Sequence, residues 1–460
     1  MRMSTEADDL AQGWRAHQAG DVVAGERAYR RVLARAPRNA DAWCYLGMAC
    51  HDQERWDEAI AAYRRALEIR PDFAIVHNNL GNTLRMQRLL RESVASFDRA
   101  IRLKPDYVNA YKNKGTALLW EGHIDEAMAC YERALTLAPD DAEVRKNLGV
   151  IRLLQGDFER GWREYEWRAR AVAGAVPSYE RPRWNGSPLD GRTTLLAAEQ
   201  GLGDTVHFIR YAAVLKARSD CRVIAACQRP LLPLLATCPG IDHLVAQDDP
   251  PPRFDVWAPL LSLPGLLRHH AVEDFPASVP YLFPPPALTD RWRTELSVYG
   301  GVRIGIAWQG NPKHQADRMR SVPLAEFAPL ASLEGLRLLS LQKGPGTDQL
   351  EGLAQRLGIV PLHDRLDATA AFVDTAAVMQ HLDLVITSDT AVAHLAGALG
   401  VPVWVALYHV PDWRWLLGRD DSPWYPTMRL FRQTAVGDWP GVFARIVEAL
   451  RARFPSLRRS

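Results

Sequence analysis

A short polar cluster, Ser388-Asp389-Thr390, follows an apolar run in the last third of the chain. Residues 382–386, apart from Asp383, are apolar and partly β-branched, which is typical of a strand buried on both faces. The three polar side chains can cap the start of the alanine-rich helix that the next residues predict. The unpaired N–H groups at such a start, those of Thr390 and Ala391 first, suit a phosphate. An ordinary strand-to-helix turn with a Ser or Asp cap also accounts for these residues.

Two more side chains could act on a substrate held there. His394 stands one turn after Thr390 on the same helix face, so it could reach a phosphate; a lone histidine among alanines equally suits a buried core position. Asp204 ends a Gly-Leu-Gly-Asp turn that contains Gly203 and follows a strand predicted at residues 193–198. A carboxylate in such a turn can take the proton of an acceptor hydroxyl, or it can simply cap the following helix.

Polar and basic loops supply further contacts for a phosphate. A long loop follows the strand predicted at residues 303–308, and a glycine-rich turn follows the strand predicted at residues 338–341. Charge that develops on a leaving phosphate must be met by donors already in place. The candidates for these donor contacts are Gln309, Lys313, Arg318, Arg320 and Lys343. No Asp-x-Asp cluster stands in a suitable loop, so we expect neither a metal ion nor a cofactor.

Strands and helices alternate around these motifs, which predicts two doubly wound, Rossmann-like lobes. The first lobe covers residues 193–287 and ends at a proline-rich stretch, and the second covers residues 288–460. Residues 171–192 carry three prolines and three glycines and predict a linker. Ligands of such lobes bind at the carboxyl edges of the sheets, so we expect an open cleft where the two edges face each other.

The first 170 residues carry a 34-residue repeat, marked by glycine and proline at fixed places. The repeated positions are Gly13, Gly47, Gly81, Gly115, Gly149, Pro37, Pro71, Pro105 and Pro139. Glycine lets two antiparallel helices approach closely, an aromatic residue fills the gap to the neighbouring pair, and proline ends the second helix. The pattern resembles the tetratricopeptide repeat and predicts an α-solenoid over residues 1–170.

Asparagines on the first helices of these repeats suggest a task for the array. The concave groove of a tetratricopeptide array usually takes an extended peptide or a segment of a partner. Asn78, Asn82 and Asn113 could hydrogen-bond the backbone of such a peptide. Solvated polar faces would show the same residues without any ligand. Our hypothesis is that the repeats recruit an acceptor protein.

The motifs and their order add up to a resemblance. The Gly-Leu-Gly-Asp turn and residues 388–394 resemble the GT-B glycosyltransferases of the heptosyltransferase family, family 9. The domain order is similar to that of the tetratricopeptide-bearing O-linked N-acetylglucosamine transferases and the flagellin-modifying transferases. The resemblance implies a nucleotide-sugar donor bound near Gly203, Asp389 and Thr390, and Asp204 as the base of an inverting displacement.

Composition narrows the class of protein. The formal net charge of +2 gives no sign of nucleic-acid binding. No run approaches the ~18 apolar residues that a membrane span needs, and the first residues lack the apolar core of a signal peptide. The six cysteines contain no Cys-x-x-Cys pair, so neither a zinc site nor a disulfide framework is indicated. We therefore expect a cytoplasmic protein.

The sequence thus predicts an α-solenoid followed by an α/β region with two Rossmann-like domains, the GT-B arrangement. We expect it to transfer a sugar from a nucleotide sugar to a hydroxyl of an acceptor, a flagellin-like protein recruited by the repeats. Two alternatives remain. One is a lipopolysaccharide or other saccharide transferase whose repeats serve assembly, and the other is an inactive tetratricopeptide scaffold.

Overall fold

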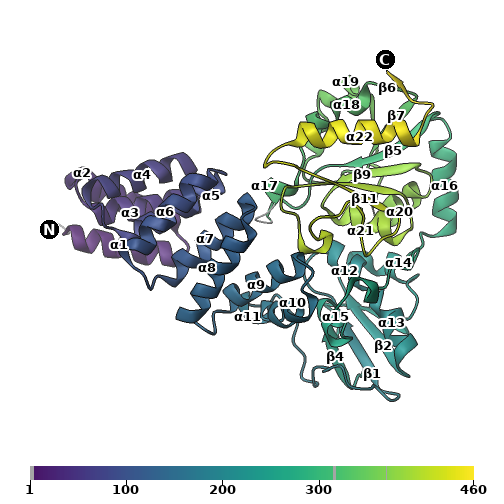
Figure 1. The fold of residues 1–460 in the computed structure, drawn as a ribbon, viewed down its shortest axis with the longest axis horizontal. Helices are drawn as coiled ribbons and strands as arrows, with labels where there is room; N and C mark the ends of the chain where they lie inside the picture. The colour runs from purple at the N-terminus through teal and green to yellow at the C-terminus, as the bar shows by residue number, and fades with distance from the viewer. Residues whose placement is uncertain (1–4, 314–316, 369, 460) are drawn as a thin grey trace. The chain divides into compact units, whose positions relative to one another are not determined.

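The computed structural model describes residues 5–313, 317–368 and 370–459 (Figure 1). Residues 314–316, which belong to the basic loop considered above, lie outside the described residues. The chain divides into two compact units, Met1–Leu148 and Gly149–Ser460. The division falls within α9 (Ala142–Leu154), earlier than the limit of residue 170 that we placed on the repeats. The helices that follow α9 therefore belong to the second unit.

The first unit is a series of antiparallel helix pairs, each helix packed on its neighbours in the chain. It comprises α1 (Glu6–Gln18), α2 (Val22–Arg35), α3 (Ala40–Asp52), α4 (Trp56–Ile69), α5 (Ala74–Met86), α6 (Leu90–Leu103), α7 (Val108–Glu121), α8 (Ile124–Leu137) and the first half of α9. Polar side chains start several of them: Thr5 caps α1, Asp21 caps α2 and Asn39 caps α3. The predicted solenoid is confirmed.

The repeated glycines allow an aromatic ring of the next helix to lie against the backbone of the first. A Cβ atom on Gly81 would lie 2.7 Å from Cε1 of Phe97, and one on Gly47 would lie 2.5 Å from Cε1 of Tyr63. Both rings are fully buried. Each ring therefore occupies the space that a side chain at the facing glycine would need, which explains why glycine and an aromatic residue repeat together.

Gly81→Ala is expected to destabilise the first unit by about 1–3 kcal/mol, because the added methyl group overpacks the Phe97 ring. Urea unfolding of the whole chain, followed by hydrogen exchange of α5 and α6, measures the change. Adding Phe97→Leu makes room for the methyl group and should restore part of the loss. If Gly81→Ala unfolds at the wild-type urea concentration, close packing at this glycine is not needed.

The second unit begins with short helices and a parallel sheet. After α9 come α10 (Phe158–Tyr165), α11 (Arg168–Ala171), β1 (Thr193–Ala197), α12 (Leu202–Phe208), α13 (Tyr211–Arg218), β2 (Arg222–Cys227), α14 (Leu232–Leu235), β3 (His243–Ala246), β4 (Val256–Pro259) and α15 (Leu263–Leu266). The strand order is β3-β2-β1-β4, with every neighbouring pair parallel. Because β1 and β4 are neighbours, the winding direction reverses between them.

A second parallel sheet completes the unit. Its elements are α16 (Pro286–Leu296), β5 (Val302–Ala307), α17 (Asp317–Arg320), α18 (Ala328–Ala331), β7 (Leu336–Ser340), α19 (Leu353–Arg356), β8 (Ile359–Pro361), α20 (Val373–Met379), β9 (Leu384–Ser388), α21 (Ala391–Ala398), β10 (Val403–Leu407), β11 (Met428–Arg432) and α22 (Trp439–Arg453). The strand order is β11-β10-β9-β5-β7-β8, all parallel. A small pair, β6 (Leu333–Glu334) and β12 (Arg458–Arg459), is antiparallel.

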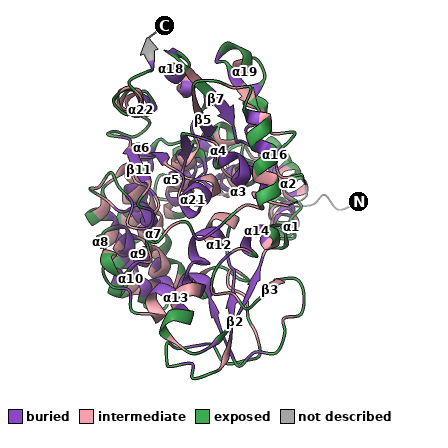
Figure 2. Cartoon of the chain, turned by 90° about the vertical axis from the view of Figure 1, so that its right-hand side faces the viewer, coloured by how far each residue is buried: buried purple, intermediate pink, exposed green. Residues whose placement is uncertain are grey.

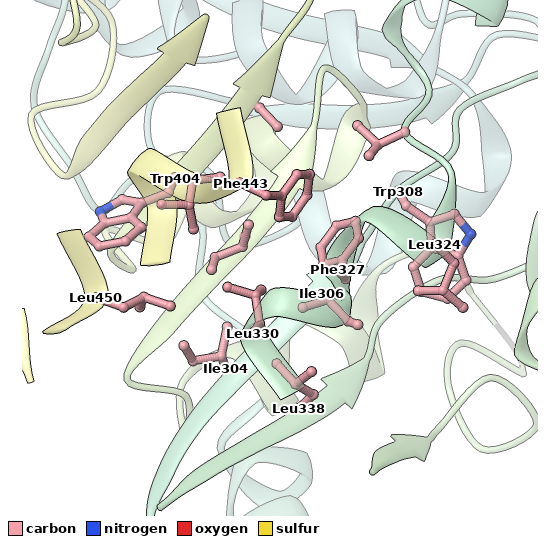
Figure 3. Close-up of a cluster of buried hydrophobic side chains, with 14 of the residues drawn as sticks. Ile304, Ile306, Trp308, Leu324, Phe327, Leu330, Leu338, Trp404, Phe443 and Leu450 are labelled. Carbon is pink, nitrogen blue, oxygen red and sulfur yellow. The ribbon is translucent and has the colours of Figure 1, made fainter. Parts of the chain in front are cut away.

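Helices cover the faces of this second sheet. Figure 3 shows side chains of α22, among them Phe443 and Leu450, directed toward Phe327, Ile304 and Ile306. On the other side of the sheet, α21 is buried along most of its length (Figure 2). The central strands β9 and β10 are buried at every residue, which explains why their sequences are continuous apolar runs rather than alternating ones. An α/β region of parallel sheets therefore follows the repeats, as predicted.

Candidate active site

The start of α21 lies where the second sheet reverses its winding. Strands β5 and β9 are neighbours, and their carboxyl ends lead to the loop after Ala307 and to the turn at Ser388. Ligands of doubly wound sheets bind at this reversal. Thr390 is the N-cap of α21 but makes no capping hydrogen bond through its side chain, and Ala391 is only half-buried. The first N–H groups of the helix therefore receive no hydrogen bond from the Thr390 side chain, and such N–H groups are what an anion site requires.

Hydroxyl groups surround this helix start. The Oγ atom of Ser388 is buried and makes no hydrogen bond within the part of the chain that the structure describes. The hydroxyl groups of Thr387 and Thr390 are 3.3 Å apart, and both residues are buried. A buried hydroxyl without a partner costs stability, so such groups usually serve a ligand or water. This geometry supports the prediction that Ser388 and Thr390 lie beside a ligand, which stays a prediction.

Asp389 is held in an environment that opposes its charge. Burial raises the pKa of Asp389 to about 6, the negative charge of Asp412 adds to the rise, and Arg320 opposes it. The native chain therefore binds this proton more tightly than the unfolded chain does. That contribution to stability is fully present below pH 3.8, the ordinary value, and is lost as the pH rises through 6.

Asp389→Asn is expected to stabilise the chain by about 1–3 kcal/mol at pH 7.5, because it removes a charge that burial penalises. The gain should shrink as the pH falls below 6, where Asp389 becomes neutral in the native state. Thermal unfolding from pH 5 to pH 8 measures it. The exposed Asp364 of the same lobe gives the control, Asp364→Asn, which should leave stability unchanged. A loss of stability in Asp389→Asn would contradict the cost assigned to this carboxylate.

His394 is packed into the surroundings of α21. Its Nδ1 atom is 3.1 Å from the hydroxyl of Tyr425, and its ring stacks on Trp415 with centroids 5.2 Å apart. Burial lowers the pKa of His394 well below its ordinary value, and the charges of Arg414 and Arg210 add to this effect. A neutral ring that accepts from Tyr425 at Nδ1 carries its proton at Nε2. In that tautomer His394 can donate a hydrogen bond to a phosphate, the contact suggested by the sequence, while its buried packing also fits the alternative of a core residue.

Asp204 performs the capping role considered for it in the sequence, and its role as a base stays a prediction. Its Oδ2 atom accepts from the N–H of Gly201, 2.9 Å away, and so caps the start of α12. Its Oδ1 atom lies 2.5 Å from Nη2 of Arg414, which belongs to the second lobe. Asp204 therefore faces the other lobe, as expected, but in an ion pair that the sequence did not indicate.

The cleft between the two sheet edges is closed at the position of Gly203. Helices α12 and α21 pack directly on each other, and a Cβ atom on Gly203 would lie 3.0 Å from Cα of Ala391. The open crevice that we expected at this glycine is therefore wrong. Glycine allows two backbones to approach where a side chain would hold them apart.

The remaining donor-contact candidates divide into two groups. Arg320 is half-buried, its Nε atom lies 3.4 Å from Oδ1 of Asp317, and its charge acts on Asp389. Lys313 is exposed on the loop that follows β5. Lys343 instead donates from Nζ to the carbonyl oxygens of Leu366 and Asp367, the second at 2.6 Å. The expectation that Lys343 offers a free cation to the donor therefore needs correction, because its charge anchors another loop.

Gln309 also contacts the protein itself. Its side-chain oxygen accepts from Nε2 of Gln349 at 3.1 Å, and its contact with a donor stays a prediction. Gln342, which the sequence did not single out, accepts from the N–H groups of both Trp308 and Gln309 at 3.0 and 3.1 Å. Gln342 therefore fixes the backbone that leaves β5. The only sequence signal for it was a polar residue directly after a buried strand.

Within the repeats, the asparagines form a small network. Nδ2 of Asn113 donates to Oδ1 of Asn78 at 3.0 Å, and Nδ2 of Asn78 donates to Oδ1 of Asn79 at 3.3 Å. Asn78 is only 5% exposed, and Oδ1 of Asn82 is buried without a hydrogen bond among the described residues. Our expectation that Asn78 presents itself to a peptide needs correction, because it orients Asn113. Asn82 and Asn113 remain candidates for peptide contact.

Comparisons with known families agree with this division of the chain. The family descriptions that match are "TPR repeat" at residues 47–87, "Tetratricopeptide repeat" at residues 108–141 and "Glycosyltransferase family 9 (heptosyltransferase)" at residues 365–414. Two segments of the chain are thus similar to tetratricopeptide repeats and a third is similar to family 9 glycosyltransferases. This third segment contains β9, α21 and β10 and ends at Arg414. It therefore includes the uncapped helix start and the arginine that meets Asp204.

Among curated proteins, the chain is 31% identical over 313 residues to Protein FlbA of Caulobacter vibrioides. The aligned region is 63% of this chain and 52% of FlbA, so the chain spans about half the length of the curated relative it matches.

Among solved structures, the crystal structure of MamA is similar at 22% identity, covering 35% of this chain and 93% of that one, with a TM-score of 0.32. The pilF protein of Pseudomonas aeruginosa is similar at 21% identity, covering 36% of this chain and 77% of that one, with a TM-score of 0.35.

No group of three or more His, Cys, Asp or Glu side chains in the described ranges is arranged to hold a metal ion. No helix in the same ranges is long and apolar enough to cross a membrane.

Proposed function

We propose that the chain transfers a sugar from a nucleotide-sugar donor to a hydroxyl group of an acceptor, with inversion at the sugar carbon. The observation that carries this proposal is the uncapped start of α21 at the winding reversal of the second sheet, inside the family 9 segment. It offers a phosphate the N–H groups of Ala391 and its neighbours. Asp204 approaches the same place from the other lobe, so a base for the acceptor lies near the donor.

The proposed reaction is a single displacement. The acceptor oxygen attacks the sugar carbon while the bond from that carbon to the phosphate oxygen breaks, and the nucleotide leaves with the electron pair. The developing charge is met by the N–H groups of α21, by Nε2–H of His394 and by the Arg320 guanidinium. Asp389 accepts hydrogen bonds from sugar hydroxyls, and Asp204 takes the acceptor's proton. We include no metal ion or cofactor, because these groups supply the required positive charge.

The acceptor in this proposal is a protein held by the repeats. Tetratricopeptide arrays bind extended segments in their concave groove, and Asn82 and Asn113 offer amide groups for a peptide backbone. Recruitment would raise the local concentration of the acceptor hydroxyl without any contact at the sugar.

A panel of nucleotides tests the donor half of the proposal. UDP, ADP, GDP and CMP, each alone and as a sugar conjugate, are added to the whole chain, and the melting temperature is recorded. A ligand present at 100 times its Kd stabilises the native state by about 2.7 kcal/mol, which shifts the melting temperature by several degrees. One nucleotide class should shift the transition of the second unit. If no nucleotide shifts it, the scaffold interpretation is favoured and the transferase proposal is wrong.

A labelled donor from the class that binds tests the acceptor half. We expect the label to appear on the acceptor protein. A peptide from that protein should lower the labelling by competing for the repeats, and it should lower it less in the Asn113→Ala variant. Label found only on saccharide, equal in wild type and Asn113→Ala, would favour the saccharide transferase in which the repeats serve assembly.

A further inference from the structure

Arg414 joins the two lobes through two carboxylates. Its Nη2 atom donates to Oδ1 of Asp204 at 2.5 Å, and its Nη1 atom donates to Oδ1 of Asp412 at 2.7 Å. Asp204 belongs to the first lobe, and Asp412 stands two residues before Arg414 in the second. The Arg414 side chain is 7% exposed, against 20% for Asp204 and 37% for Asp412. One guanidinium therefore satisfies the proposed base from a largely buried position.

Arg414 has donor capacity that the protein does not use. Its Nε atom is buried and makes no hydrogen bond to any described residue. The guanidinium lies over the ring of Trp413, 4.3 Å from its centroid, and a ring face cannot replace a charged acceptor. Planar guanidinium groups favour paired contacts with phosphate oxygens. Arg414 can therefore gain hydrogen bonds by turning from Asp204 toward a phosphate.

The start of α21 lies within reach of such a movement. Asp204 follows Gly203, whose backbone contacts Ala391, the first residue of α21. Trp415, the next residue after Arg414, stacks on His394 of the same helix. Burial is the main cause of the lowered pKa of His394, and the charge of Arg414 is the second, as expected for neighbouring groups. Arg414 is thus positioned between the proposed base and the proposed phosphate site.

In the observed pairing, both carboxylate oxygens of Asp204 are already engaged. One accepts from the Arg414 guanidinium and the other from the N–H of Gly201, so Oδ1 meets an acceptor hydroxyl only after Arg414 moves away. We propose that the diphosphate of the donor takes Arg414 from Asp204, so that the base is released only when the donor is bound. This inference rests on the proposed function and adds to it an order of events: donor first, then proton transfer from the acceptor.

The exchange of partners fits the proposed displacement. Before the reaction, Arg414 moves its hydrogen bonds from the Asp204 carboxylate to the diphosphate. Asp204, no longer paired, takes the proton of the acceptor hydroxyl as the new carbon–oxygen bond forms. The nucleoside diphosphate leaves with the electron pair of the broken bond, and Arg414 offsets its added negative charge. No oxidant, reductant or further reactant is needed.

A double-mutant cycle on binding tests the exchange. The probe is whichever of UDP, ADP and GDP gives the largest thermal shift with the wild-type chain, and Kd is measured by calorimetry. Arg414→Gln should weaken binding by about tenfold or more, because a charge-assisted contact to phosphate is lost. Asp204→Asn should tighten binding by about threefold or more, because Arg414 no longer has to leave an anion. The double variant should bind like Arg414→Gln.

A matched control comes from the same loop. Arg419 pairs with Asp421 two residues away, as Arg414 pairs with Asp412, but its ion pair stays within the second lobe. Arg419→Gln should bind the probe as the wild type does. If Arg414→Gln does not fold, Arg414→Lys replaces it in the cycle, with weaker binding still expected because lysine cannot make the paired contact.

The possible results distinguish the exchange of Arg414 partners from the proposed sugar transfer on which it rests. A purely structural ion pair would make both single variants bind more weakly or leave both unchanged, and either result overturns the exchange. Tighter binding in Asp204→Asn together with weaker binding in Arg414→Gln supports it. If the wild-type chain binds CMP but none of the three diphosphates, the exchange is overturned and the transferase proposal survives. If it binds none of the four nucleotides, both are wrong.

Discussion

Asp204→Asn should lower the rate of sugar transfer by about 10²- to 10⁴-fold, because the amide cannot take the proton of the acceptor hydroxyl. The fold should persist, since an asparagine side chain can still accept the N–H of Gly201 and cap α12. Nucleotide binding should persist as well and become tighter, because Arg414 no longer has to leave a carboxylate to reach the phosphate. Turnover should therefore fall while nucleotide affinity rises, which appears as a lower Kd measured on the same preparation.

Asp220→Asn provides the matched control, since Asp220 is an exposed carboxylate of the same lobe at a distance from α12 in the chain. It should leave both turnover and nucleotide binding unchanged. Wild-type turnover in Asp204→Asn would remove this residue from the mechanism. Loss of both turnover and nucleotide binding would show that Asp204 supports the fold rather than the chemistry.

The parts of the site that the sequence predicted are contiguous in the chain. Ser388, Asp389 and Thr390 stand beside the strand and helix that position them, so local patterns sufficed to place them at a sheet edge. The repeats were predictable for a similar reason, because each glycine meets an aromatic residue sixteen positions on, as Gly81 meets Phe97. Local order in the sequence carried both predictions.

Contacts between distant segments could not be predicted in this way. Arg414 and Asp204 are 210 residues apart, so no local pattern links them. Arg414 stands between Trp413 and Trp415, and aromatic residues of this kind are also expected where two lobes pack together. Lys343 and Gln309 stand at the predicted sheet edge, but their side chains also bond to loops within the second lobe, which the sequence did not indicate. A position at an edge constrains where a residue lies but not which partner it takes.

The two sheets differ at their winding reversals, and this difference supports a division of labour. In the second sheet the reversal leads to the uncapped start of α21. In the first sheet, Glu199 follows β1 and its Oε1 atom accepts from the N–H of Leu261, which follows β4. Glu199 is paired there with Arg168 of α11. Because protein side chains already occupy the first reversal, a nucleotide is better accommodated in the second lobe.

The Arg168–Glu199 pair is deeply buried. Nε and Nη2 of Arg168 donate to the two carboxylate oxygens of Glu199 at 2.9 and 2.7 Å, and Nη2 also donates to Ser262. The exposed fractions of the two side chains are 3% and 0%. These contacts raise the pKa of Arg168 despite the opposing effect of burial, which keeps the guanidinium charged. Nη1 of Arg168 also donates to the partly exposed Glu166 at 2.8 Å, so removing Glu199 leaves Arg168 with this one carboxylate and without its fully buried partner.

Glu199→Gln is expected to destabilise the second unit by about 3–5 kcal/mol, because Arg168 remains charged and loses its buried partner. Urea unfolding followed by hydrogen exchange of β1 and β4 isolates this unit from the repeats. The double variant Arg168→Met/Glu199→Leu should recover much of the loss, since an apolar pair avoids both desolvation costs. Arg163→Gln, on the exposed face of α10, is the control and should change nothing. Wild-type stability in Glu199→Gln would mean that water reaches Arg168 and that the first reversal is open to a ligand after all.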